Sequence, residues 1–130
     1  MIFGRYPVPY LLINNYSGID AIDLLTHDKT VVIPGLKDNK RMSIDTVEMK
    51  LYFRNGSSIS RANLDGTGVE VFLQNVEVWK MEIDWMRRRI FWISNADWRI
   101  YVTNLEGKEK RPLTETGLWN WEIAVDPTVG

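Results

Sequence analysis

Few residues in this sequence could do chemistry. The chain has one His and no Cys, so it cannot assemble the usual zinc sites or a thiolate nucleophile. His27 stands in the polar stretch THDK, which indicates a surface turn. No phosphate-binding, dinucleotide-binding or serine-hydrolase motif is present. The sequence therefore predicts no catalytic residues, no metal ligands and no cofactor.

Three carboxylates recur along the chain. Asp45, Asp84 and Asp126 each follow an apolar residue, and they are 39 and 42 positions apart. One carboxylate in each repeat of a sequence predicts a structural role, because acid–base catalysis needs a group that is marked out from its equivalents. If the three carboxylates converged in a channel, they would be the only candidates for a hydrolase or lactonase site. That enzyme is retained as a second alternative.

Other features repeat with the same period. The stretch 63–66, Asn-Leu-Asp-Gly, returns at 104–107 as Asn-Leu-Glu-Gly, and the β-forming runs 12–15, 52–55 and 91–94 are 40 and 39 positions apart. Between them lie short runs of β-branched and aromatic residues, separated by Gly, Asn, Asp and Pro. A period of about 40 residues with four short strands in each unit is typical of β-propeller blades.

The phase of the repeat predicts how the blades are completed. We expect an all-β chain of three four-stranded blades over residues 10–130, preceded by a lead segment at 1–9. The pattern begins on the second strand of a blade and reaches the first strand of another at 121–126. Two copies joined head to tail would therefore close a six-bladed ring as a homodimer. A three-blade piece of a larger propeller would show the same phase, and this alternative stays open.

These repeats resemble the class B (YWTD) repeat of the low-density lipoprotein receptor family. The resemblance is carried by LYFRNGSSISRANLDGTGVEVFLQN at 51–75 and IFWISNADWRIYVTNLEGKEKRPLTE at 90–115, with EIDW and IAVDP as first strands. The family tetrapeptide Tyr-Trp-Thr-Asp is replaced here by Tyr-Phe-Arg-Asn at 52–55, so its acidic end is lost. The resemblance implies a six-bladed propeller that binds proteins or peptides and is extracellular or secreted. It also implies accompanying cysteine-rich modules, and this chain contains none.

The candidate ligand-binding residues lie in loops that share one face of a propeller. These loops join the second strand to the third, or the fourth strand to the next blade. Large aromatic side chains around a channel mouth can anchor a protein ligand. The candidates are Tyr16, Trp79, Trp98, Trp119, Trp121 and Glu122. We therefore expect a non-catalytic binding scaffold; the first alternative is a purely structural, self-assembling propeller module without a ligand.

Composition excludes other classes. The formal net charge is −1, which does not favour nucleic-acid binding, since that needs a concentrated basic surface. The one basic run, Arg87-Arg88-Arg89, fits a solvated turn. The sequence has no run of 18 apolar residues, so it does not predict membrane insertion, and no signal peptide is visible. The sequons at Asn15 and Asn55 would permit glycosylation.

Overall fold

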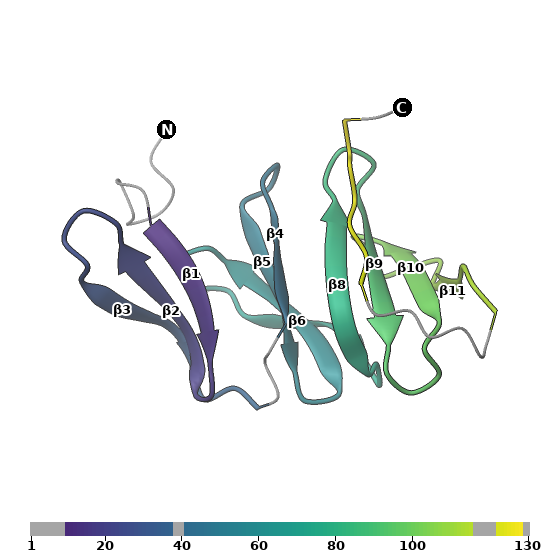
Figure 1. The fold of residues 1–130 in the computed structure, drawn as a ribbon, viewed down its shortest axis with the longest axis horizontal. Helices are drawn as coiled ribbons and strands as arrows, with labels where there is room; N and C mark the ends of the chain where they lie inside the picture. Colours follow the sequence, from purple (N-terminus) through teal and green to yellow (C-terminus); the bar gives the residue numbers. More distant parts are fainter. Residues whose placement is uncertain (1–9, 38–40, 116–121, 129–130) are drawn as a thin grey trace.

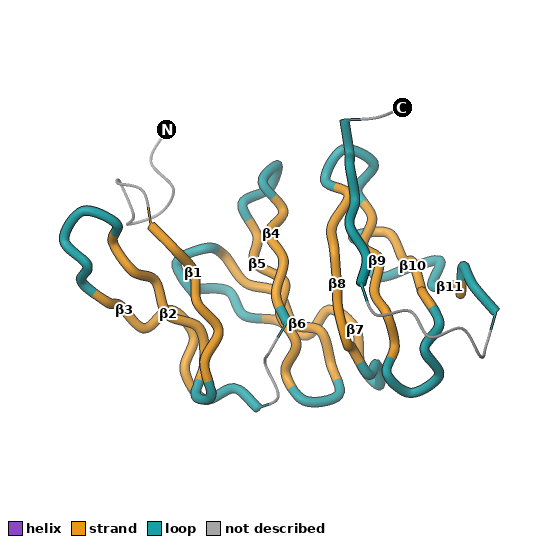
Figure 2. The backbone as a smooth tube through the Cα atoms, viewed as in Figure 1, coloured by secondary structure: helices purple, strands orange, loops and turns teal. Residues whose placement is uncertain are grey.

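The computed structural model describes residues 10–37, 41–115 and 122–128. These residues form three antiparallel sheets (Figures 1 and 2), which we call blades 1, 2 and 3 in chain order. Blade 1 consists of β1 (Tyr10–Asn15), β2 (Gly18–Asp23) and β3 (Lys29–Pro34). Blade 2 consists of β4 (Met42–Asp45), β5 (Lys50–Asn55), β6 (Ser58–Asn63) and β7 (Glu70–Gln74). Blade 3 consists of β8 (Val78–Asp84), β9 (Arg89–Ser94), β10 (Ile100–Asn104) and β11 (Arg111–Pro112).

Each blade is a meander in which consecutive strands pair. Blade 1 has three strands and begins with β1 as an edge strand, whereas blades 2 and 3 begin with β4 and β8 as the first of four. The predicted strand pattern and its phase over blades 1 to 3 are thus seen in the described residues. The expected lead segment at 1–9 lies outside the described residues.

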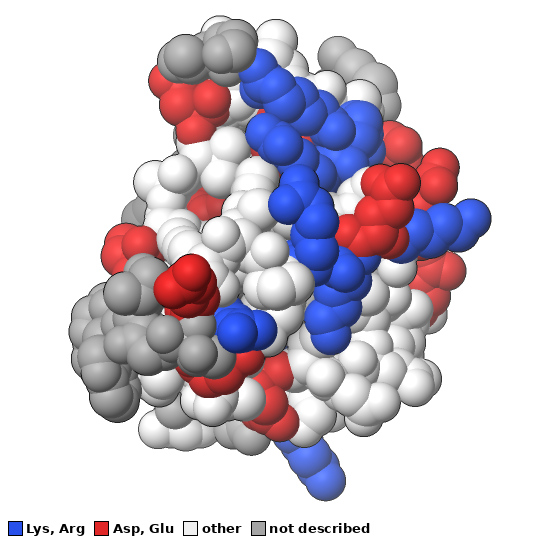
Figure 3. Space-filling view, turned by 90° about the vertical axis from the view of Figure 1, so that its right-hand side faces the viewer, with Lys and Arg blue, Asp and Glu red and all other residues white. Residues whose placement is uncertain are grey.

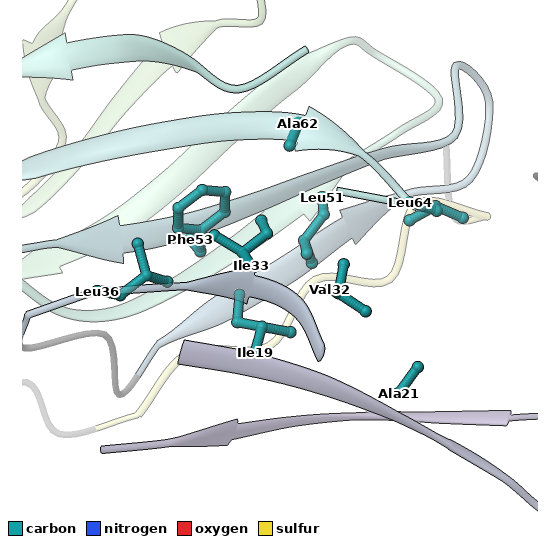
Figure 4. Packing of buried hydrophobic residues seen from close by; sticks show 9 residues of the cluster. All are labelled: Ile19, Ala21, Val32, Ile33, Leu36, Leu51, Phe53, Ala62 and Leu64. Carbon is teal, nitrogen blue, oxygen red and sulfur yellow. The ribbon is translucent and has the colours of Figure 1, made fainter. Parts of the chain in front are cut away.

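Hydrophobic cores lie between blades. In the first core, Ile19 and Ile33 of blade 1 meet Leu51, Phe53 and Ala62 of blade 2 (Figure 4). All five side chains are at most 4% exposed. Alternate residues of a strand point to opposite faces, so Tyr52 lies on the other face of blade 2.

The second core joins blades 2 and 3. Tyr52 and Ile59 of blade 2 meet Ile83, Ile90 and Trp92 of blade 3. The middle blade is therefore apolar on both faces and is covered by a neighbour on each side. Any blade of this kind needs two neighbours to bury its apolar surface.

Turn chemistry brings blades 1 and 2 into close contact. Gly66 adopts φ +87°, and a Cβ at this position would lie 2.1 Å from the carbonyl oxygen of Val32 in β3. Only glycine combines this backbone conformation with such an approach. The recurring Asn-Leu-Asp-Gly turn thus serves both to reverse the chain and to pack against the preceding blade.

Polar groups also join blade 2 to blade 3. Arg54 donates from Nη1 to the Val78 carbonyl at 2.7 Å, and Arg61 donates from Nη1 to the Leu105 carbonyl at 2.7 Å. Arg88 donates from Nη1 to Asp45 Oδ1 at 2.7 Å. The expectation of a wholly solvated basic turn at 87–89 was therefore wrong for Arg88, because this side chain reaches across to a buried carboxylate.

The segment 122–128 is not assigned as a strand. It runs alongside β8 and β9 of its own chain (Figure 1), and Arg87 Nη1 lies 3.4 Å from the Pro127 carbonyl oxygen. A strand assignment requires hydrogen bonds to a neighbouring strand, and within the described residues 122–128 have no such neighbour. Residues 121–126 were predicted to form the first strand of a blade, and the described part of this segment, 122–126, is not a strand. Trp121 lies outside the described residues.

Candidate binding surface

One end of the blades gathers the loops in which binding residues were expected. Backbone hydrogen bonds link these loops: Gly35 N donates to Ser17 O at 2.7 Å, and Gly56 N donates to Lys37 O at 2.6 Å. In blade 3, Asn95 N donates to Glu77 O at 3.1 Å. The strand-connecting turns and the junctions between blades therefore share one rim.

Two of the expected aromatic residues meet on this rim. The rings of Trp79 and Trp98 are 5.5 Å apart between centroids and are inclined at 65°. The guanidinium carbon of Arg41 lies 5.0 Å from the centroid of the Trp79 ring, and Arg41 Nε donates to the Trp79 carbonyl. We call Arg41, Trp79 and Trp98 the rim cluster. All three side chains are partly buried, so their geometry is fixed by packing.

The other expected residues lie apart from the rim cluster or outside the described chain. Tyr16 is 94% exposed in the turn between β1 and β2 of blade 1. Glu122 is exposed, and its Oε1 lies 3.3 Å from Lys80 Nζ. Trp119 and Trp121 fall outside the described residues.

A polar hollow of about 400 Å³ adjoins the rim cluster. Its lining includes Asn14, Arg41, Trp79, Lys80 and Glu122. The sequence interpretation missed Arg41 and Lys80, although a signal was available. The two residues are 39 positions apart and occupy the same place in successive repeats, just before or within the first strand of a blade.

The pKa values of two carboxyl groups near the rim cluster are shifted in opposite directions. Burial raises the pKa of Glu82, and Lys80 at 3.8 Å opposes this rise. Burial also disfavours the charge on Asp97, but hydrogen bonds from Tyr101 Oη at 2.5 Å and from the Arg99 amide at 3.1 Å hold its pKa below the ordinary value. The charge on Asp97 is therefore favoured, whereas that on Glu82 depends on the nearby Lys80.

The three repeated carboxylates hold turns. One carboxylate oxygen of each accepts a hydrogen bond from the backbone amide two or three residues later: Val47 for Asp45, Arg87 for Asp84 and Thr128 for Asp126. Asp45 and Asp84 are buried, at 0% and 1% exposure, whereas Asp126 is exposed. Among the described residues, no three His, Cys, Asp or Glu side chains form a group that could hold a metal ion. The arrangement is suited to structural capping.

The two sequon asparagines also hold turns. Asn15 Oδ1 accepts from the amides of Ser17 and Gly18, both at 3.0 Å, and Asn15 Nδ2 donates to Asp20 at 2.6 Å. Asn55 Oδ1 accepts from the Lys37 amide at 3.2 Å. These contacts give both residues a structural reason to be Asn, and their glycosylation stays a prediction.

Comparison with known proteins identifies the architecture. The chain superposes on the crystal structure of a nidogen/laminin complex with a TM-score of 0.73 at 18% identity, covering 90% of this chain and 47% of that one. It superposes on a TolB-like protein from Agrobacterium tumefaciens with a TM-score of 0.67 at 16% identity, covering 81% and 43%. The sheets are therefore blades of the β-propeller class.

Sequence similarity points to one family within this class. Low-density lipoprotein receptor-related protein 8 from Gallus gallus is 27% identical over an alignment that covers 79% of this chain and 12% of the relative. No protein-family model matches the chain. The chain is similar to the low-density lipoprotein receptor class B (YWTD) repeat propellers. It spans only about an eighth of the length of that relative. The described residues include no helix that is long and apolar enough to cross a membrane.

Proposed function

We propose that this chain is a non-catalytic propeller scaffold that binds a protein or peptide at its loop-bearing rim. The rim cluster is the observation that carries this proposal. The relative found by sequence similarity is a receptor-related protein, and one similar solved structure is a complex of nidogen with laminin. An extracellular or secreted location follows from the same relationship and is part of the proposal.

The chemistry of the rim cluster suits a protein ligand. Trp and Arg are the side chains that most often dominate the energetics of protein interfaces. Here the edge-to-face Trp pair and the stacked Arg41 are already ordered. A ligand would therefore bind without a large entropic cost for fixing these side chains.

We further propose that two copies close a six-bladed ring. Support comes from apolar positions on blade 1 that are exposed although their repeat equivalents are buried. Leu11, Ile13 and Leu24 are 51%, 37% and 43% exposed. The equivalent positions in blade 2 are Leu51, Phe53 and Leu64, at 0%, 0% and 7%. Burying an aliphatic side chain contributes about 1.5 to 3 kcal/mol, so covering this face would stabilise a ring.

The far face of blade 3 shows the reciprocal situation. Phe91, Ile100 and Leu113 are partly or largely exposed, whereas the equivalent Tyr52 and Ile59 of blade 2 are buried beneath blade 3. One chain thus presents both halves of a blade-to-blade contact. In a head-to-tail pair of copies, blade 1 of each copy would pack against blade 3 of the other, so the same contact would form twice with two-fold symmetry.

A purely structural module is the competing function, because the rim cluster also makes contacts within the chain. Solved structures of hydrazine synthase and tricorn protease are similar to the chain at 15% and 16% identity; these likenesses concern the fold alone. An enzyme would need convergent reactive groups, and the three repeated carboxylates, Asp45, Asp84 and Asp126, serve as turn caps.

The experiment compares Trp98→Ala with Met86→Ala as a matched control. Met86 is 55% exposed in the turn between β8 and β9, at the end opposite the rim. Peptides selected from a displayed random library on the wild-type protein are titrated against each variant by fluorescence anisotropy. We expect Trp98→Ala to weaken binding by about tenfold or more and Met86→Ala to leave it unchanged, with both variants folded as judged by their circular dichroism spectra. Equal binding by all three proteins would refute the rim as the binding surface.

A further inference from the structure

A groove of about 450 Å³ lies between the segment 123–126 and the outer face of blade 3. Its apolar lining comprises Phe91, Ile100, Leu113, Ile123 and Val125. It is placed where the next blade of a propeller would pack. The groove therefore has both an apolar floor and an extended segment along one side.

Three of the four charged residues that line the groove are engaged with one another, and the fourth, Asp126, accepts hydrogen bonds from Thr128. Asp84 lies 3.1 Å from Arg89 and 3.6 Å from Arg87, and Arg89 also stacks over Phe91 at 5.0 Å. Seen from the side of blade 3, Lys and Arg form a band beside uncharged surface (Figure 3). A partner that binds in the groove would therefore mainly cover the apolar floor.

Two internal pairings show how the first strand of a blade meets the second. In blade 2 the register is Met42 with Phe53, Ser43 with Tyr52, Ile44 with Leu51 and Asp45 with Lys50. In blade 3 the same register holds for Met81 with Trp92 through Asp84 with Arg89. In both blades the Asp that caps the turn ends the first strand, opposite the first residue of the second.

The repeat transfers this register to the segment 123–126 and to β1. Asp126 is the equivalent of Asp45 and caps its turn in the same way. β1 begins at Tyr10, the equivalent of Lys50, and is the edge strand of blade 1. Among the described residues, the segment 123–126 occupies the position of a first strand but has no second strand beside it. β1 occupies the position of a second strand but has no first strand beside it.

We propose that β1 of a second copy pairs antiparallel with residues 123–126, in a register that places Ile13 opposite Ile123, Leu12 opposite Ala124 and Leu11 opposite Val125. This inference rests on the two-copy ring proposed above and specifies its contact. Leu11 and Ile13 then enter the groove beside Phe91 and Ile100. A shift by one residue would turn both side chains to the other face of the sheet, so the register is tightly specified.

The contact between copies is mainly apolar. Arg54 and Arg61 bridge blade 2 to blade 3, but the repeat places Ile93 and Val102 at these positions in blade 3. The contact with a second copy therefore lacks these two arginine hydrogen bonds. Because salt screens charge pairs but not apolar contacts, the dissociation constant of the dimer should change less than about threefold between about 0.05 M and about 0.5 M NaCl.

Disulfide trapping tests the register directly, because the natural chain contains no Cys. The double variant Leu12→Cys/Ala124→Cys places the two thiols directly opposite each other across the proposed pair. Paired residues in an antiparallel sheet have Cα atoms about 4.5 to 5.5 Å apart, which suits a disulfide. The control Leu11→Cys/Ala124→Cys is offset by one residue, and its side chains point to opposite faces. We expect a covalent dimer on non-reducing gels for the first variant and little or none for the control.

Light scattering of the same variants separates the two proposals. A dimer in solution that does not cross-link through Leu12→Cys/Ala124→Cys, or that links equally well in the offset control, would overturn the register and leave the ring standing. A monomer, or a disulfide formed within one chain, would overturn both.

A second pair of variants guards against misfolding of the cysteine variants. Leu11→Asp should convert the dimer to a monomer with an unchanged circular dichroism spectrum. Leu25→Asp should remain a dimer, although Leu25 is 71% exposed, because its repeat equivalents are the acidic Asp65 and Glu106. A dimeric Leu11→Asp variant would contradict the docking of β1.

Discussion

The ion pair between Asp45 and Arg88 should be a main polar contact between blades 2 and 3. Asp45 is 0% exposed. Burial disfavours its charge, yet hydrogen bonds from Arg88 and from the Val47 amide hold its pKa below the ordinary value. We expect Arg88→Met to leave this carboxylate without its cation. Met is the appropriate replacement because Met49 occupies the equivalent turn position in blade 2. The two residues have nearly the same backbone angle, φ 56° for Met49 and φ 57° for Arg88.

The expected loss follows from the burial of the two partners. Removing one member of a fully buried pair costs about 3 to 5 kcal/mol. The side chain of Arg88 is 31% exposed, so water can partly solvate the carboxylate that remains. We therefore expect Arg88→Met to lower the free energy of unfolding by about 2 to 3 kcal/mol.

A double-mutant cycle with Asp45→Asn isolates the pair itself. Urea unfolding is followed by tryptophan fluorescence at one fixed protein concentration for the wild type, both single variants and the double variant. The coupling energy should be at least about 1.5 kcal/mol. The matched control is Arg87→Ala, which should cost less than about 1 kcal/mol, because Arg89 still neutralises Asp84 at 3.1 Å. A coupling below about 0.5 kcal/mol would refute the assignment of Asp45–Arg88 as a strong link between blades.

Two further predictions concern backbone packing and pH. Gly66→Ala should destabilise the protein by more than about 3 kcal/mol, since it adds a clash with the Val32 carbonyl to the cost of a positive φ; Gly35→Ala, at φ +71° with open space around it, should cost only about 1 kcal/mol. Thermal unfolding of the two variants checks this, and equal losses would show that the blades are not in tight contact at Gly66. Because the pKa of Asp45 is lowered by folding, its contribution is present above the unfolded pKa of about 4 and is lost as pH falls through the folded value. The midpoint of thermal unfolding should thus fall more steeply below about pH 4 for the wild type than for Asp45→Asn, and parallel profiles would contradict this.

The repeat made much of the fold predictable. The spacing of 39 to 42 residues and the turn residues located the strands, because alternation and turn chemistry are local properties of a sequence. The same spacing predicted that Asp45 and Asp84 are structural, and their positions at turn caps agree with that interpretation.

Contacts between blades were beyond a sequence interpretation based on the repeat. Arg88 has Met49 as its equivalent, so nothing periodic marked it as the partner of Asp45. The stacking of Arg41 on Trp79 likewise depends on how two blades sit against each other. Such one-of-a-kind contacts depend on three-dimensional placement, whereas the repeat reports only what successive blades share.

The arrangement of two chains in one ring is tested most directly by the mass of the purified protein in solution. Multi-angle light scattering during gel filtration should give twice the chain mass of 15.2 kDa, with the same value across a range of loading concentrations. A single species at 15.2 kDa that stays well folded and soluble would contradict the ring of two copies.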